Sequence, residues 1–118
     1  MLKKILSALA LIFFLSCFQF CSLTQIKDES PKINLVKIGS KFRINLPENH
    51  SDGYLWQLSE NYDKKLLHDV GAVWHGNEKG IDFNLEALSI GQTTLSFVKR
   101  KYTDTISNKT FIVNIIAK

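Results

Sequence analysis

The 118-residue chain is long enough for one domain with one modest core, and its composition, 45% hydrophobic and 22% charged, is ordinary for a globular protein. The formal net charge is +4, and Lys3 and Lys4 in the N-terminal segment supply two of these charges. So small an excess does not predict a polyanion-binding surface, and we expect no nucleic acid partner.

Residues 1–21 have the pattern of a secretory signal. Two lysines precede an apolar run over 5–15, which is too short to cross a bilayer comfortably. Residues 14–17, Phe-Leu-Ser-Cys, resemble the bacterial lipoprotein box, in which the cysteine becomes lipidated. We therefore predict export to the cell envelope and a membrane anchor through a lipid on Cys17. The alternatives are lipidation of Cys21, ordinary cleavage, or a retained helical anchor.

Polar residues dominate the stretch 22–31, and it contains few large apolar side chains. We predict a flexible tether there, followed by a folded domain over 32–118. No cysteine follows Cys21. The domain must therefore be stable without a disulfide, and thiol catalysis is excluded from it.

From residue 41 onward, apolar and polar residues alternate with the period of two that is typical of half-buried strands. Clusters of Gly, Asn, Asp and Ser separate these segments. We predict an all-β, immunoglobulin-like antiparallel sandwich of about seven strands. Residues 61–70 lack a clean apolar stripe, so we expect a loop that leads into a strand through Trp74. The side chains expected to face the core are those of Phe42, Ile44, Leu46, Tyr54, Trp56, Leu58, Ile81, Phe83, Leu85, Ala87, Leu95, Phe97, Phe111, Val113 and Ile115.

A turn-rich loop joins two of the predicted strands. Residues 46–56 read Leu-Pro-Glu-Asn-His-Ser-Asp-Gly-Tyr-Leu-Trp. This frame resembles the first binding loop of the chagasin family, small immunoglobulin-like inhibitors of papain-type cysteine proteases. The usual family loop reads Asn-Pro-Thr-Thr-Gly, followed by an aromatic residue and Trp. Here His50 stands at the Pro position, and Ser51 and Asp52 replace the two threonines.

A second segment carries the same resemblance. Residues 87–97 contain an Ala-x-x-x-Gly corner followed by alternating apolar residues, which chagasin-type sequences place before their third binding loop. The order and spacing of the two segments extend the match over residues 38–116. The two segments are persuasive only in combination.

The resemblance implies a monomeric, reversible inhibitor that blocks the active-site cleft of a papain-like cysteine protease with three adjacent loops. It implies no catalytic residue and no cofactor. The first loop touches the catalytic pair of the protease, and the other two brace the flanks of its cleft. We expect the second loop over 75–80 and the third over 99–104, although a third-loop motif starting at Lys99 would place Lys101 at the aromatic position. The candidate contact residues are Asn49, His50, Ser51, Asp52, Gly53, Gly76, Gly80, Arg100 and Tyr102.

Each candidate also has a simpler interpretation. Asn49 and Asp52 are typical capping residues of a turn, and Gly53 permits an unusual dihedral angle. Lys99, Arg100 and Lys101 equally suit a solvated basic turn. The negative charge of Asp52 would weaken binding near a catalytic thiolate. Trp74 suits either a closed end of the sandwich or an exposed anchor.

Enzymatic and metal-binding functions are poorly supported. His50, Ser51 and Asp52 are adjacent in one loop, whereas a hydrolase triad draws its members from separate elements. The three histidines lack the spacing of metal ligands, and no glycine-rich phosphate loop follows a strand. Two non-enzymatic alternatives to inhibition remain. One is an envelope lipoprotein whose basic third loop contacts another protein or an anionic surface, and the other is a purely structural envelope lipoprotein.

Overall fold

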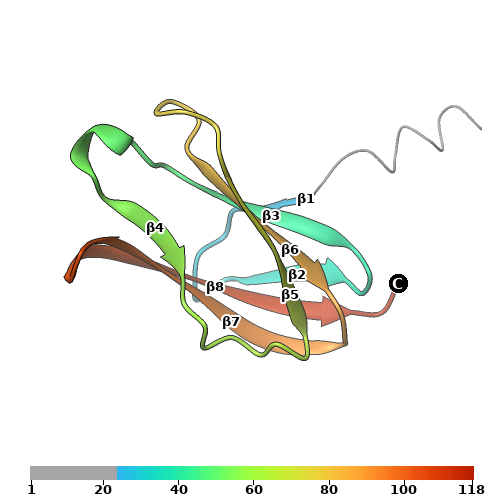
Figure 1. Cartoon of the computed structure of the whole chain (residues 1–118). Coiled ribbons are helices and arrows are strands. Elements are labelled where there is room, and N and C mark those ends of the chain that lie inside the picture. Colours follow the sequence, from blue (N-terminus) through green and yellow to red (C-terminus); the bar gives the residue numbers. More distant parts are fainter. Residues whose placement is uncertain (1–23) are drawn as a thin grey trace, which may run out of the picture.

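Two four-stranded sheets pack face to face in the computed structural model, which describes residues 24–118 (Figure 1). One sheet has the strand order β1-β3-β6-β5 and the other β2-β8-β7-β4. No helix within residues 24–118 is long and apolar enough to span a membrane. The strands are β1 (Thr24–Ile26), β2 (Ile33–Lys37), β3 (Lys41–Leu46), β4 (Leu55–Leu58), β5 (Leu67–Trp74), β6 (Ile81–Ala87), β7 (Gly91–Lys101) and β8 (Asp104–Ile116), and a short 3-10 helix, η1, covers His50–Asp52.

The core lies between the sheets and is filled by the inward residues of the period-two pattern. Phe97 of β7 contacts Phe83 of the other sheet at a ring-centroid distance of 4.8 Å and Phe111 of β8 at 5.7 Å. These tilted and edge-on aromatic contacts join the two layers. The predicted core is confirmed except for Tyr54, which precedes β4 and does not pack against the core, while Leu58 and Ile81 are half-buried at its border. The predicted residues that are buried are Phe42, Ile44, Leu46, Trp56, Phe83, Leu85, Ala87, Leu95, Phe97, Phe111, Val113 and Ile115.

The all-β sandwich is confirmed, but its strand number and pairing differ from the prediction. The structure has eight strands, and both sheets are mixed because β1 runs parallel to β3 and β2 runs parallel to β8. The remaining neighbours are antiparallel. Both parallel pairs lie at sheet edges, where the N-terminal chain joins one sheet and then crosses to the other. Such non-local pairing leaves no mark on the periodicity of the sequence.

The predicted tether over 22–31 is wrong for Thr24–Ile26, which forms β1. Ile26 is only 5% exposed and pairs with Ile44 of β3. This strand could not be predicted from the sequence, because three residues with one inward apolar side chain are too few to show the alternation of apolar and polar residues. The predicted loop over 61–70 is confirmed for residues 61–66, but β5 already begins at Leu67 and includes residues 67–70.

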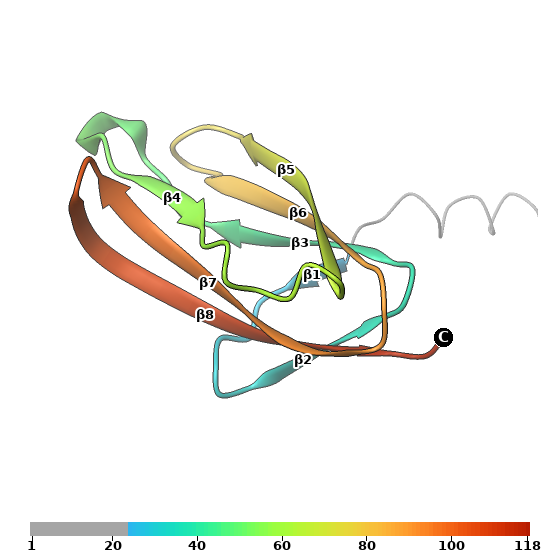
Figure 2. The same ribbon diagram turned by 60° about the horizontal axis from the view of Figure 1, so that its bottom comes forward.

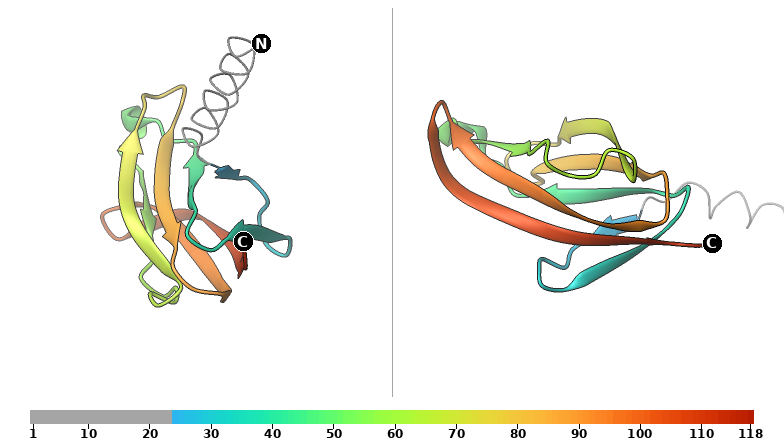
Figure 3. Two further views of the ribbon diagram at one scale, coloured as in Figure 1. Left: turned by 90° about the vertical axis from the view of Figure 1, so that its right-hand side faces the viewer. Right: turned by 90° about the horizontal axis from the view of Figure 1, so that it is seen from below.

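Strand direction gathers three connections at one end of the sandwich (Figure 2). β3, β5 and β7 all finish at this end, because β6 is antiparallel to both β3 and β5, and β4 returns from the same end antiparallel to β7. The turn between β6 and β7 and the start of β1 lie at the opposite end (Figure 3).

Replacing Ile26 by Ala tests whether β1 belongs to the domain. We expect Ile26→Ala to lower the free energy of unfolding by about 2–3 kcal/mol, because it empties a buried site. Urea unfolding gives this value. Gln25→Ala is the matched control, since Gln25 is exposed in the same strand, and equal effects of the two variants would restore the tether interpretation.

Candidate functional site

Three connections lie side by side at the end where β3, β5 and β7 finish, and we call them the three-loop edge. They are the β3–β4 loop over 47–54, the β5–β6 loop over 75–80 and the turn over 102–103 between β7 and β8. The β3–β4 loop touches both neighbours. The backbone N–H of His50 donates to Asn77 Oδ1 at 3.0 Å, and Tyr54 donates its hydroxyl to Asp104 Oδ2 at 2.7 Å. The edge is therefore one continuous surface.

The tip of the β3–β4 loop is held by its own turn chemistry. Asn49 caps η1 by accepting from the backbone N–H of Ser51 at 2.9 Å. Asp52 Oδ1 accepts from the backbone N–H of Tyr54 at 2.9 Å, and Gly53 adopts a left-handed conformation with φ of +78°. The turn interpretation of these residues is therefore correct. It does not exclude binding, because the same bonds present a rigid, exposed tip.

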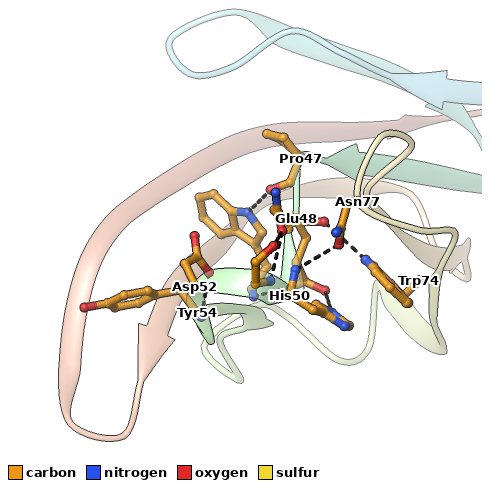
Figure 4. Close-up of polar contacts among 10 residues, drawn as sticks. Pro47, Glu48, His50, Asp52, Tyr54, Trp74 and Asn77 are labelled. Carbon is orange, nitrogen blue, oxygen red and sulfur yellow. Dashed lines mark hydrogen bonds and ion pairs between the residues drawn. The ribbon is translucent and has the colours of Figure 1, made fainter.

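Glu48 is buried inside this loop and contacts its tip (Figure 4). Its side chain is only 2% exposed, and its two oxygens have different partners. Oε1 accepts from the backbone N–H of Trp56 at 2.7 Å, and Oε2 lies 2.8 Å from Nε2 of His50. A buried carboxylate needs such partners. Glu48 thus ties the beginning of the loop to its tip and to the strand that follows.

Trp74 joins the β5–β6 connection to the central loop. Its ring stacks on His50 at a centroid distance of 3.8 Å and an interplanar angle of 12°. Its indole N–H donates to the backbone oxygen of Glu48 at 3.2 Å (Figure 4). Trp74 is 41% exposed, so it braces the edge and also presents part of its ring to solvent.

The β5–β6 loop is closed at its base, where the backbone N–H of His75 donates to the oxygen of Gly80 at 2.8 Å. His75 Nε2 also lies 2.9 Å from Asp82 Oδ2. Gly80 is buried with φ of +74°, and a side chain there would collide with the backbone oxygen of Leu46. Gly80 therefore sets a close approach of two chain segments, whereas Gly76 faces open space.

The third predicted loop, 99–104, is shorter in the structure. Lys99, Arg100 and Lys101 continue β7, and only residues 102–103 form the turn. Tyr102 is 90% exposed at its tip with φ of +55°. The turn that contains it ends the long β7–β8 hairpin (Figure 2), and Tyr102 is the most exposed of the large apolar and aromatic residues described.

Charged groups link the hairpin to the central loop. Lys101 Nζ lies 3.4 Å from the backbone oxygen of Asp52 and 5.8 Å from the centroid of the Tyr54 ring. The hydrogen bond to Asp104 raises the pKa of the Tyr54 phenol above its ordinary value. On the outer side of the hairpin is a shallow concavity of about 430 Å³, lined by Gly53, Leu55, Gln57, Arg100, Lys101 and Tyr102.

The structure thus brings all nine predicted contact residues to one end of the fold, while Cys17 lies outside the described residues. Their part in binding stays a prediction. Sequence analysis missed Glu48 and Asn77 as supports of the edge. The burial of Glu48 could have been predicted from the sequence. It follows Phe42, Ile44 and Leu46 at the same spacing of two residues, which places its side chain on the inward side. The contact of Asn77 with His50 could not have been predicted, because it depends on the distance between two loops.

The histidines and acids of the edge do not form a metal-binding cluster within residues 24–118. No group of three or more His, Cys, Asp or Glu side chains in this range is placed to hold a metal ion. His50 and His75 each contact a single carboxylate. A sandwich that presents three contiguous loops in this way is suited to binding another macromolecule.

Comparison with known proteins identifies the family. Residues 35–115 match the model of the chagasin family peptidase inhibitors, I42, and the chain belongs to this family. Its family is one of inhibitors, which confirms the prediction that the protein is not an enzyme. The curated proteins contain no match.

Two solved structures share the fold at low sequence identity. The cysteine protease inhibitor EhICP2 from Entamoeba histolytica matches with a TM-score of 0.65 and 18% identity, over 80% of this chain and 93% of that one. Amebosin, whose structure was determined in solution, matches with a TM-score of 0.59 and 15% identity, over 82% of this chain and 99% of that one. These similarities support the sandwich architecture.

The two glycines of the second loop should differ in their tolerance of a side chain. Gly76→Ala should cost about 1–2 kcal/mol, because only the positive φ opposes it. Gly80→Ala should cost at least about 1 kcal/mol more, because the methyl group also meets the β3 backbone. Urea unfolding of both variants measures the difference. Equal losses would contradict the close approach of Gly80 to Leu46.

Proposed function

We propose that this protein is a reversible inhibitor of papain-like cysteine proteases and acts by inserting its three-loop edge into the active-site cleft. The observation that carries the proposal is the contiguous, internally braced edge in a member of a peptidase inhibitor family. EhICP2, a cysteine protease inhibitor, supports the choice of target class.

The geometry of the edge suits steric blocking. Its central tip, His50–Asp52, is a short 3-10 turn, so it does not offer an extended segment for cleavage. Asn49 and Asn77 accept hydrogen bonds from the backbone of the tip, and Glu48 contacts the His50 ring, so the tip is ordered before any partner arrives. Little conformational entropy is then lost on binding, and more of the contact energy contributes to affinity.

The negative charge of Asp52 was expected to weaken binding near a catalytic thiolate. In the structure this charge is partly balanced by its neighbours. Its carboxylate accepts the backbone N–H of Tyr54, and the ammonium group of Lys101 lies beside the same turn. Both neighbours reduce the negative potential at the tip. The central loop is therefore compatible with a cleft that contains a thiolate and an imidazolium.

Tyr102 is the residue of the hairpin best placed to act as an anchor. Tyr102→Ala should raise the inhibition constant for a papain-like protease about 30-fold, the effect of losing an aromatic hot spot of about 2 kcal/mol. The measurement is a competitive titration of protease activity. Ile90→Ala is the control, because Ile90 is 62% exposed at the opposite end of the sandwich.

The same assay decides between inhibition and the two alternatives. Tight, competitive inhibition that collapses when residues 50–52 are replaced by Gly and Ala supports the proposal. A folded protein that inhibits no papain-like protease at micromolar concentration would instead favour a binding module of the envelope. The purely structural alternative predicts no partner that depends on these loops.

We also propose that the protein is exported and anchored to the membrane by a lipid on Cys17. Thr24 pairs with Phe42 at the beginning of β3, so the described chain starts at the end opposite the three-loop edge (Figure 3). An anchor upstream of β1 would therefore hold the sandwich with its loops directed away from the bilayer. This orientation leaves the edge accessible to a protease in the surrounding space.

Substitution of the anchoring cysteine tests this part of the proposal. Cys17→Ser should move the protein from the membrane fraction to the soluble fraction after cell lysis, because the lipid supplies most of the membrane affinity. Immunoblotting of the two fractions checks the result. Cys21→Ser should leave the protein in the membrane fraction, and the reverse pattern would assign the lipid to Cys21.

A further inference from the structure

We propose that the concavity on the outer side of the β7–β8 hairpin binds an acidic side chain of the target, so that the protein favours papain-like proteases with a negatively charged surface beside the active-site cleft. The choice of a protease as the target rests on the proposed function. The affinity of the concavity for acidic groups can be measured without a protease.

The concavity has an apolar floor on the face of two paired strands. Leu55 of β4 lies opposite Arg100 of β7 in the antiparallel register, so both side chains project from the same face of the sheet. Leu55 is 43% exposed there. Gln57 continues the same face along β4, and Tyr102 borders the concavity at the hairpin turn. The volume of about 430 Å³ is enough for a few side chains of a partner.

The charged residues that line the concavity are both positive. They are Arg100 and Lys101, and no carboxylate within residues 24–118 forms an ion pair with either of them. Arg100 Nε donates to Thr105 Oγ1 at 3.3 Å, a contact across the hairpin that restrains the guanidinium group. Two cations without a carboxylate partner beside an apolar floor are suited to receive a carboxylate from another molecule.

The position of Lys101 depends on the absence of a side chain at Gly53. A β-carbon at residue 53 would lie 3.2 Å from Lys101 Cε and 3.3 Å from its Nζ. Glycine at this position therefore lets the lysine lie against the central loop, where its Nζ is 3.4 Å from the backbone oxygen of Asp52. A cation that is already held in place loses less side-chain entropy when it binds.

The acids of the adjoining segments do not occupy the concavity. Asp52 Oδ1 accepts from the backbone N–H of Tyr54 at 2.9 Å, and Asp104 Oδ2 accepts from its hydroxyl at 2.7 Å. Neither acid is among the lining residues. The lining surface is therefore locally positive, which is the charge that attracts an acidic partner.

The partner that fits this site is an acidic side chain with an apolar neighbour on a protein surface. The carboxylate would contact Arg100 and Lys101, and the apolar neighbour would cover Leu55. The hairpin flanks the central tip, so a tip inserted into a cleft turns the concavity toward the surface beside that cleft. Attraction between exposed charges acts mainly on the rate of association and on the choice among partners.

Association rates of two charge-matched variants test the proposal. Arg100→Glu and Lys37→Glu each replace one positive charge by a negative one, and Lys37 is exposed near the opposite end of the sandwich. With the papain-like protease that the wild type inhibits most strongly, Arg100→Glu should slow association about tenfold at about 0.02 M salt and less than about twofold at about 0.5 M salt. Lys37→Glu should stay within about twofold of the wild type at both salt concentrations. The onset of inhibition in a stopped-flow assay gives these rates.

A peptide titration reads the concavity without a protease. The probe is the tripeptide acetyl-Glu-Leu-Glu-amide, and its uncharged match is acetyl-Gln-Leu-Gln-amide. We expect the acidic peptide to shift the backbone amide resonances of Leu55, Arg100 and Tyr102 with a dissociation constant of about 1 mM, and the uncharged peptide to leave them unchanged. Arg100→Glu should abolish the shifts, and Lys37→Glu should retain them.

The two measurements separate the failure of this inference from the failure of the proposed function. If the protein inhibits a protease and the two variants associate at equal rates, the inference is overturned and the inhibitory function stands. If it inhibits none, the peptide titration decides. Shifts at the concavity with the acidic peptide alone would then support the acid-binding site while the inhibitory function fails, and equal shifts with both peptides, or none with either, would overturn the inference as well.

Discussion

The buried carboxylate of Glu48 is the constraint on which the functional end of this protein depends. A carboxyl group excluded from water is stable only where hydrogen-bond partners surround it. Here the Trp56 backbone N–H donates to one oxygen and a ring nitrogen of His50 lies 2.8 Å from the other, so the entry, the tip and the exit of the central loop are held in one arrangement. Two indole N–H groups fix the adjoining backbone, because Trp56 donates to Pro47 and Trp74 donates to Glu48.

The sandwich supplies the second requirement, which is the convergence of distant segments. β3, β5 and β7 finish at the same end, so residues 50 positions apart meet there, as Tyr54 and Asp104 do. The same topology places the start of β1 at the other end. The three-loop edge and the first described strand therefore lie at opposite ends of the sandwich.

Much of the candidate site was recognisable in the sequence because its signals are local. Asn49, Asp52 and Gly53 have side chains or dihedral preferences that specify a tight turn between two alternating segments, and the structure contains that turn. The brace beneath the turn is different in kind. Glu48 interacts with Trp56 and His50 across the loop, and Asn77 reaches it from another connection. Such contacts depend on how the elements are placed, which a residue pattern does not record.

The sequence by itself determined the alternation of buried and exposed side chains, and through it the all-β class, most strand positions and the core that includes Phe42, Phe97 and Phe111. These properties follow from the period of two of a half-buried strand. Only the tertiary structure decided the parallel edge pairs, the inclusion of β1 in a sheet and the assembly of three loops into one edge. Each of these depends on pairing between segments far apart in the chain, which follows from three-dimensional packing and not from local residue order.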